Sequence, residues 1–210
     1  GNQNTVKGKH ADAFGDGNDA YGKQTQSFGD NNKVYANGSI GYGINNKIGA
    51  QPADPNSDKA TREADTNTNS AAVFGLNNAV VGNNILALGK DNKITDTSTT
   101  NATVIGFGST ASAANATAIG TAASALANET VAIGQKANAS GQNSNAFGSQ
   151  ANASGTSSLA VGTGSVASND STVAIGNDST VTGASAVAVG ASATSTGKWS
   201  TALGDSANAK

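Results

Sequence analysis

The sequence predicts an all-β protein folded as a parallel β-roll, or β-solenoid, in which each 14-residue coil forms hydrogen bonds to the coils before and after it. Three observations predict this fold. A glycine recurs every 14 residues along most of the chain, a bulky residue precedes that glycine, and a small residue precedes the bulky one. Bulky and small side chains in alternation are typical of a strand, because successive side chains of a strand point to opposite faces.

The recurring glycines, which we call the anchor glycines, set the length of the coil. They leave 13 intervals, and 11 of these are 14 residues long. The two exceptions contain 18 and 3 extra residues, so the repeat continues after each of them. The anchor glycines are Gly1, Gly15, Gly29, Gly43, Gly75, Gly89, Gly106, Gly120, Gly134, Gly148, Gly162, Gly176, Gly190 and Gly204.

Each repeat predicts two short strands separated by turns. The first strand ends at the bulky residue and the anchor glycine, as at Ile133-Gly134. The second lies five residues after the glycine, where Val34, Ile48 and Val80 are examples. Gly, Asn and Ser fill the positions between the strands, as expected for turns. Helices are not expected, because glycine is frequent and no 3.6-residue period persists.

Composition narrows the classes of function. The 210 residues carry a formal net charge of −2, which gives no electrostatic reason to expect nucleic acid as a partner. The absence of cysteine excludes disulfides and thiolate metal sites. No apolar run reaches the length of a membrane span, so direct membrane contact is not expected. There is no signal peptide, and any targeting or anchoring part is expected to lie outside this chain.

A two-strand coil encloses few side chains, so a lone chain is expected to be marginally stable. The small residue of each repeat is alanine in many coils, such as Ala118, Ala132 and Ala146. An alanine face would allow another backbone to approach closely. We therefore expect oligomerisation, with chains packed side by side around an axis through this alanine column.

The repeat resembles a known family. The segments TAIG (117–120), ETVAIG (129–134), STVAIG (171–176) and SAVAVG (185–190), each followed by a turn and a short strand, resemble the YadA-like head repeat of trimeric autotransporter adhesins. The resemblance covers nearly the whole chain apart from residues 50–69. Within the family, the long insertion and the Asn-rich early coils look most similar to adhesins of the ubiquitous surface protein A type.

The resemblance implies a left-handed roll assembled as a homotrimer. It implies a bacterial surface adhesin head, displayed at the outer membrane, that contributes to virulence by binding fibronectin, laminin, collagen or cell receptors. The stalk and membrane anchor of such proteins are not in this chain. The alternative function is a structural spacer that projects another binding domain from the cell surface.

One head domain is expected over residues 1–210, interrupted by a long insertion at 50–69 and a short one at about 96–101. The long insertion contains both prolines and a run of charged residues. Long loops on a rigid scaffold often carry binding residues. The candidates for ligand binding there are Asp58, Lys59, Arg62 and Glu63. A tolerated surface insertion without function is the alternative.

Lys33, Lys47 and Lys93 occupy one repeat position, four residues after the anchor glycine. Lys33 and Lys47 should stack on adjacent coils, about 4.8 Å apart at the backbone. Because like charges repel at that spacing, this column does not serve stability and could receive an acidic ligand. Solvated lysines that protect a sheet edge are the alternative.

No catalytic residues and no cofactor are expected. The glutamates are few and the aspartates are scattered over turns, and the single histidine, His10, lacks partners for a zinc site or a catalytic triad. Asp54, Asn56 and Asp58 begin like a calcium loop, but Lys59 stands where such a loop needs glycine, so no metal site is expected. An ice-binding face is not expected either, because it would need unbroken threonine columns and other residues interrupt those of this chain. The sole tryptophan, Trp199, is expected at the trimer interface, with a ligand contact as the alternative.

Overall fold

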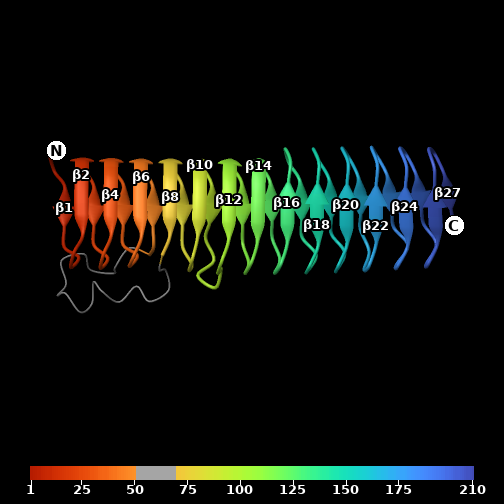
Figure 1. Ribbon diagram of the computed structural model, residues 1–210, viewed down its shortest axis with the longest axis horizontal. Coiled ribbons are helices and arrows are strands. Elements are labelled where there is room, and N and C mark those ends of the chain that lie inside the picture. Colours follow the sequence, from red (N-terminus) through yellow and green to blue (C-terminus); the bar gives the residue numbers. More distant parts are fainter. Residues whose placement is uncertain (51–69) are drawn as a thin grey trace. The chain divides into compact units, whose positions relative to one another are not determined.

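The computed structural model describes residues 1–50 and 70–210, and its fold is a parallel β-solenoid without helices in those residues. The chain divides into two compact units, which are described separately: unit 1 is Gly1–Gly108 and unit 2 is Ser109–Lys210. In each unit a coil contributes one odd-numbered and one even-numbered strand, except that the last coil of unit 2 contributes only β27 (Figure 1). The prediction of an all-β solenoid is confirmed. The left hand and the single domain over 1–210 stay predictions.

In unit 1 the odd-numbered strands form one parallel sheet and the even-numbered strands another, both in chain order. The odd strands are β1 (Thr5–Val6), β3 (Asp19–Ala20), β5 (Lys33–Val34), β7 (Lys47–Ile48), β9 (Ala79–Val80) and β11 (Lys93–Ile94). The even strands are β2 (Asp12–Asp16), β4 (Gln26–Asp30), β6 (Ile40–Ile44), β8 (Ala72–Leu76), β10 (Leu86–Lys90) and β12 (Thr103–Phe107).

Unit 2 repeats the arrangement with shorter even strands after its first coil. Its odd strands are β13 (Thr110–Ala111), β15 (Ser124–Ala125), β17 (Asn138–Ala139), β19 (Asn152–Ala153), β21 (Val166–Ala167), β23 (Thr180–Val181), β25 (Thr194–Ser195) and β27 (Asn208–Ala209). Its even strands are β14 (Thr117–Thr121), β16 (Val131–Ile133), β18 (Asn145–Phe147), β20 (Leu159–Val161), β22 (Val173–Ile175), β24 (Val187–Val189) and β26 (Thr201–Leu203).

The strands pair with the register that the 14-residue repeat predicts. Residues one repeat apart lie opposite each other, as Ala132 does with Ala146. The register also continues past the long insertion, because Gly43 of β6 lies opposite Gly75 of β8. Like residues therefore stack in columns along each unit.

The interior of each coil is filled by small side chains. In unit 2 the alanine before each bulky residue and the second-strand residue, such as Ala132 and Ala139, are both completely buried. In unit 1 the second-strand position holds larger residues, and Gly41 replaces the alanine opposite them. A Cβ atom added at Gly41 would lie 2.9 Å from Val34 Cγ2 and 3.1 Å from Ile48 Cδ1. The narrow coil therefore conserves volume by exchanging size between facing positions.

The turn after the anchor glycine is built differently in the two units. In unit 1 an asparagine ladder runs through the interior: Asn4, Asn18, Asn32, Asn46, Asn78 and Asn92. The Asn32 side chain donates hydrogen bonds to the Gly43 carbonyl at 2.7 Å and to the Asn18 side chain at 3.1 Å. It accepts hydrogen bonds from both the backbone and the side-chain nitrogen of Asn46, at 3.1 Å and 2.8 Å.

In most coils of unit 2 the same backbone groups bond to each other without asparagine. The Ala137 N–H donates to the Gly134 carbonyl at 3.3 Å, within one coil. A direct turn bond of this kind needs no side chain, so alanine or serine can occupy the ladder position. The Asn-rich early coils and the Ala-rich later coils thus satisfy the backbone groups of the same turn in two ways, through an asparagine side chain or through a direct backbone hydrogen bond.

Both insertions enter at one kind of turn, the turn between an odd strand and the next even strand. Residues 51–69 follow Gly49 and Ala50, soon after β7 ends. The three extra residues before Gly106 lie after β11, where the Thr99 N–H donates to the Asp96 carbonyl at 3.1 Å. Asn78 bonds to Asn46 across the long insertion at 2.9 Å, so the ladder is not interrupted by it.

Candidate binding surfaces

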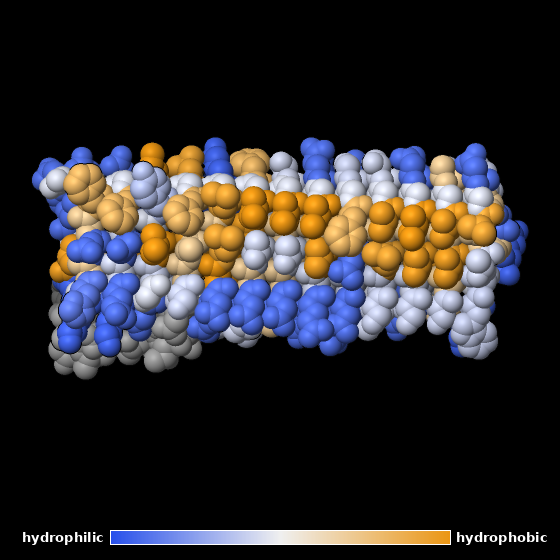
Figure 2. Space-filling view, viewed as in Figure 1, coloured by the Kyte–Doolittle hydropathy of each residue, from blue (hydrophilic) through white to orange (hydrophobic). Residues whose placement is uncertain are grey.

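The bulky residue of each repeat lies on the outer face of the even-numbered strands, not in the coil interior. Phe14 is 72% exposed and Tyr42 is 58% exposed in unit 1, and Leu203 is 76% exposed in unit 2. The space-filling view shows apolar residues gathered in a band on this side of each unit (Figure 2). We call the outer side of the even strands the apolar face.

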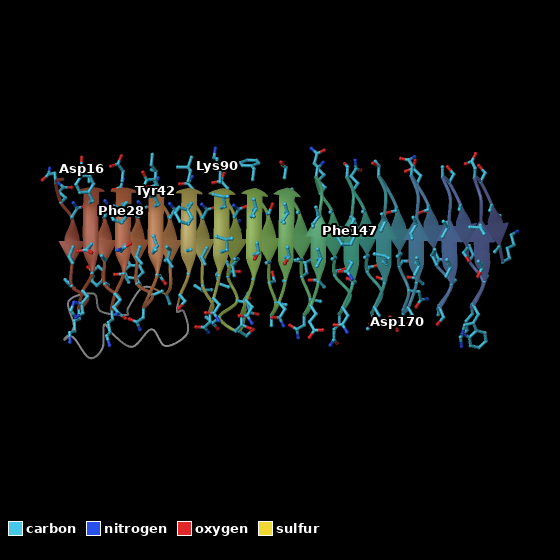
Figure 3. All side chains as sticks on the ribbon, in the orientation of Figure 1. Asp16, Phe28, Tyr42, Lys90, Phe147 and Asp170 are labelled. Carbon is cyan, nitrogen blue, oxygen red and sulfur yellow. The ribbon has the colours of Figure 1, made fainter. Side chains whose placement is uncertain are left out.

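In unit 1 the apolar face carries stacked aromatic rings. The ring centroids of Phe28 and Tyr42 are 6.2 Å apart, and those of Tyr42 and Phe74 are 6.4 Å apart, in tilted pairs. A shallow hollow is lined by Phe28 and Tyr42 together with Phe14 and Ile44. Figure 3 shows Phe28 and Tyr42 on the even strands of this unit and Phe147 on β18 of unit 2.

In unit 2 two largely aliphatic columns make up the apolar face. The members are Ile119, Val131, Ile133, Phe147, Leu159, Val161, Val173, Ile175, Val187, Val189 and Leu203. They are half-buried or exposed in the single chain, and Asn145 interrupts one column between Val131 and Leu159. An extended apolar surface of this kind is unusual for a monomeric protein and marks a site of association.

The expectation that alanine forms the packing surface between chains is wrong. Ala118, Ala132 and Ala146 are completely buried inside their own coils. The strand alternation was read correctly, but a coil formed by two strands has room for only small side chains inside, so the bulky side chains point out.

The lysine column lies on the outer face of the odd-numbered strands of unit 1. Lys33 pairs with Lys47 in register, and Lys47 pairs with Ala79, which pairs with Lys93. All three lysine side chains are exposed, while Val34, Ile48 and Ile94, the next residues in the strands, are fully buried. The predicted stacking of Lys33 on Lys47 is confirmed. A binding role for the column stays a prediction.

The other candidates are either outside the described residues or in separate turns. Asp58, Lys59, Arg62 and Glu63 lie outside the described residues, as do Asp54 and Asn56 of the rejected calcium loop. His10 and Trp199 both occupy turns in the left-handed region, with φ of 58° and 62°. Trp199 is 70% exposed, and Lys198 Nζ lies 4.1 Å from its ring centroid. The structure therefore brings together only the lysines among the predicted ligand-binding residues.

The described residues show no metal centre and no membrane-spanning helix. Within residues 1–50 and 70–210, no cluster of three or more His, Cys, Asp or Glu side chains is arranged to hold a metal ion. The same residues contain no helix of the length and hydropathy that a bilayer crossing requires.

Buried tyrosines occupy the odd-strand side of unit 1. The rings of Tyr21 and Tyr35 have centroids 5.3 Å apart, and Lys7 Nζ lies 5.1 Å from the centroid of Tyr21. Burial raises the pKa of Tyr35 to about 12, with smaller contributions from the Asp19 carboxylate and from Tyr21. These rings were not singled out in the sequence, because their burial depends on the turn that follows each odd strand.

Comparison with known proteins agrees with the fold. Residues 100–193 match the YadA head domain repeat in six overlapping segments, each about two coils long. No curated protein matches the chain. Heads of this family are adhesive or structural modules of trimeric autotransporter adhesins, exposed at the cell surface. Over residues 100–193 the repeat match and the solenoid together identify a YadA-like head of a trimeric autotransporter adhesin.

Proposed function

We propose that this head is a homotrimer that packs through its apolar face and binds host extracellular-matrix proteins or cell receptors. The apolar face is the observation that carries the proposal. It repeats in coil after coil of both units, and its aromatic and aliphatic side chains are exposed in the single chain. Burying such surface contributes about 25 cal/mol per Å², which supplies the stability that the small interior of each coil lacks.

Adhesion would use the surface that trimer formation leaves open. This includes the lysines on the odd strands. The charged residues of the insertion, Asp58, Lys59, Arg62 and Glu63, lie outside the described residues and stay candidates from the sequence. Three copies of each site on one particle allow weak single contacts to add up through avidity. Fibronectin, laminin and collagen are the candidate ligands.

A pair of substitutions tests the packing surface. Ile175→Asp places a charge on the apolar face of β22, and Thr180→Asp places the same charge on the outer side of β23 in the next strand. Ile175→Asp should dissociate the trimer in sedimentation experiments, because three carboxylates would be desolvated at the interface. Thr180→Asp should remain trimeric. A wild-type head that sediments as a folded single chain would contradict the proposal.

Binding is then measured by surface plasmon resonance on immobilised fibronectin, laminin and collagen. The trimer should bind at least one of them, and the Ile175→Asp variant should lose about 100-fold or more in apparent affinity through lost avidity. Deleting residues 50–69 tests the contribution of the insertion.

The structural spacer remains the second candidate, and one observation favours it for unit 2. The outer face of its odd strands carries small uncharged residues such as Thr110, Ser124 and Thr194, which offer few anchors for a protein ligand. Cell attachment that persists after removal of the head from the whole adhesin would support the spacer.

A further inference from the structure

The charges of unit 1 are distributed unevenly over its two sheets. Asp12, Asp16 and Asp30 are exposed on the even strands β2 and β4, and Lys90 is exposed on the even strand β10. Lys33, Lys47 and Lys93 are exposed on the odd strands, where the one described carboxylate in their column is the half-buried Asp19. We call these three lysines the lysine strip.

The fold does not need the lysine strip. Ala79 occupies the same column between Lys47 and Lys93 and pairs in the same register. Like charges directly opposite on neighbouring strands are destabilising. Among the described residues, no carboxylate lies within 4.0 Å of the ammonium groups of the lysine strip. The ion pair that the described residues do contain joins Lys90 to Asp91 at 3.9 Å and involves none of the three strip lysines. Asp19 lies opposite Lys33 on the preceding strand, so among the described residues the repulsion is offset at that end of the strip and not at Lys47 or Lys93.

A hollow interrupts the lysine strip at Ala79. Its described lining includes Lys47, Gly49, Ala79, Val81, Thr95 and Thr97. The lining is mostly small or apolar, and the two threonines add hydroxyl groups to it. Lys47 and Lys93 stand on the two rungs that flank Ala79. The strip therefore combines positive charge with a recess and hydrogen-bonding groups.

We propose that the lysine strip and its hollow bind a sulfated polysaccharide chain that runs along the stack of coils. This inference rests on the proposed adhesive function and names its ligand class. The strip spans four rungs, which are β5, β7, β9 and β11, and the three spacings between them add up to roughly 14 Å. One spacing is comparable to the length of one pyranose residue. A sulfate of the chain can then meet an ammonium group at successive rungs, and a sugar ring fits in the hollow.

The described part of the same surface lacks the side chains with which proteins bind two other anionic partners, single-stranded nucleic acid and anionic membranes. Binding of single-stranded nucleic acid uses exposed aromatic rings on which bases stack, but Tyr21 and Tyr35 on this side are only 7% and 3% exposed. Binding to an anionic membrane needs exposed apolar side chains on the basic face. Here the apolar residues of the odd strands, Val34, Ile48 and Ile94, are buried.

Two triple variants of the whole chain test the proposal, with heparin as the immobilised probe. The strip variant is Lys33→Gln, Lys47→Gln and Lys93→Gln. The matched control is Lys90→Gln, Lys136→Gln and Lys198→Gln, which changes the net charge equally at exposed positions elsewhere. Circular dichroism verifies that both are folded. The strip variant should lose at least tenfold in affinity, and the control less than about twofold.

The salt dependence gives a second readout. If the three lysines contact sulfates, the slope of log K against log salt should decrease in magnitude by about 2 in the strip variant, using roughly 0.7 per contact. The control should keep the wild-type slope. Ala79→Leu, which fills the hollow without changing the charge, should also weaken heparin binding.

Several outcomes would overturn the proposal. These are equal losses in both triple variants, unsulfated hyaluronan binding as tightly as heparin, or binding of phosphatidylserine vesicles without binding of heparin. Failure of the proposed function is distinguishable. If both triple variants bind matrix proteins as the wild type does, and neither the wild type nor the variants bind heparin, only this inference fails. If heparin binding follows the strip but no matrix protein is bound, the inference stands.

Discussion

The asparagine ladder makes a quantitative prediction for Asn32→Ala. The substitution removes the partner of one group in the interior of unit 1, the Asn46 N–H, 3.1 Å from Asn32 Oδ1. The Gly43 carbonyl, 2.7 Å from Asn32 Nδ2, is not counted, because the register of β4 with β6 also places it in the backbone ladder. A buried polar group left unpaired costs about 1–3 kcal/mol, which is the expected loss in the free energy of unfolding. The Asn46 side chain keeps its bond to the Gly75 carbonyl and is not counted.

Ser165→Ala is the matched control at the same repeat position of unit 2. The Ser165 hydroxyl donates to the Gly162 carbonyl at 3.0 Å, but that carbonyl also accepts the Ser165 N–H at 3.3 Å. No backbone group is left unpaired, so the loss should be about 1 kcal/mol or less.

Urea unfolding followed by circular dichroism, at one protein concentration because an oligomer's stability depends on it, compares the two variants. Hydrogen exchange of the Asn46 amide should accelerate at least tenfold in Asn32→Ala, since about 1.4 kcal/mol corresponds to a factor of ten. The reasoning is refuted if Asn32→Ala loses no more than Ser165→Ala and the Asn46 amide stays protected. In that case the Asn46 N–H and the Gly43 carbonyl would have bonded to each other, as the equivalent groups do in unit 2.

Two further predictions concern the anchor glycine and the buried tyrosine. Gly134 has φ of +138°, and an added Cβ would lie within 2.3 Å (a hard overlap) of the Gly148 carbonyl oxygen, so Gly134→Ala should cost about 3 kcal/mol or more in thermal or urea unfolding. Gly108→Ala, at φ of +65° with open space around it, should cost only about 1–2 kcal/mol, and equal losses would contradict the steric argument. For Tyr35, whose pKa is raised to about 12 in the folded protein against an ordinary 10.0, the folded state holds the proton more tightly. The tyrosine should therefore contribute no pH dependence well below pH 10, and stability should fall by about 1.4 kcal/mol per pH unit between pH 10 and 12. Tyr35→Phe should lack this component when urea midpoints are compared across that range, and identical profiles would refute it.

Periodicity alone was sufficient to predict the coils, because a parallel stack places residues one repeat apart in the same column. It correctly placed Lys33 beside Lys47 and kept register across the insertion. It did not show which side of each strand faces inward, since Ala132 and Ile133 alternate equally well either way. That choice depends on the interior volume of a two-strand coil, which is a property of the folded backbone. Likewise the asparagines were noticed as turn residues, but their ladder of side-chain bonds requires the three-dimensional stack.

The turn that follows each odd strand has a consequence for protein engineering. The Asn46–Asn78 bond at 2.9 Å shows that neighbouring coils recognise each other through their interior, whatever length of chain joins them at that edge. New sequence can therefore be grafted there with little effect on the scaffold, because the entropic cost of closing a surface loop increases only slowly with the length of the loop. A foreign epitope inserted at the corresponding turn of another coil, for example between Ser140 and Gly141, would be displayed once per protomer on an unchanged framework.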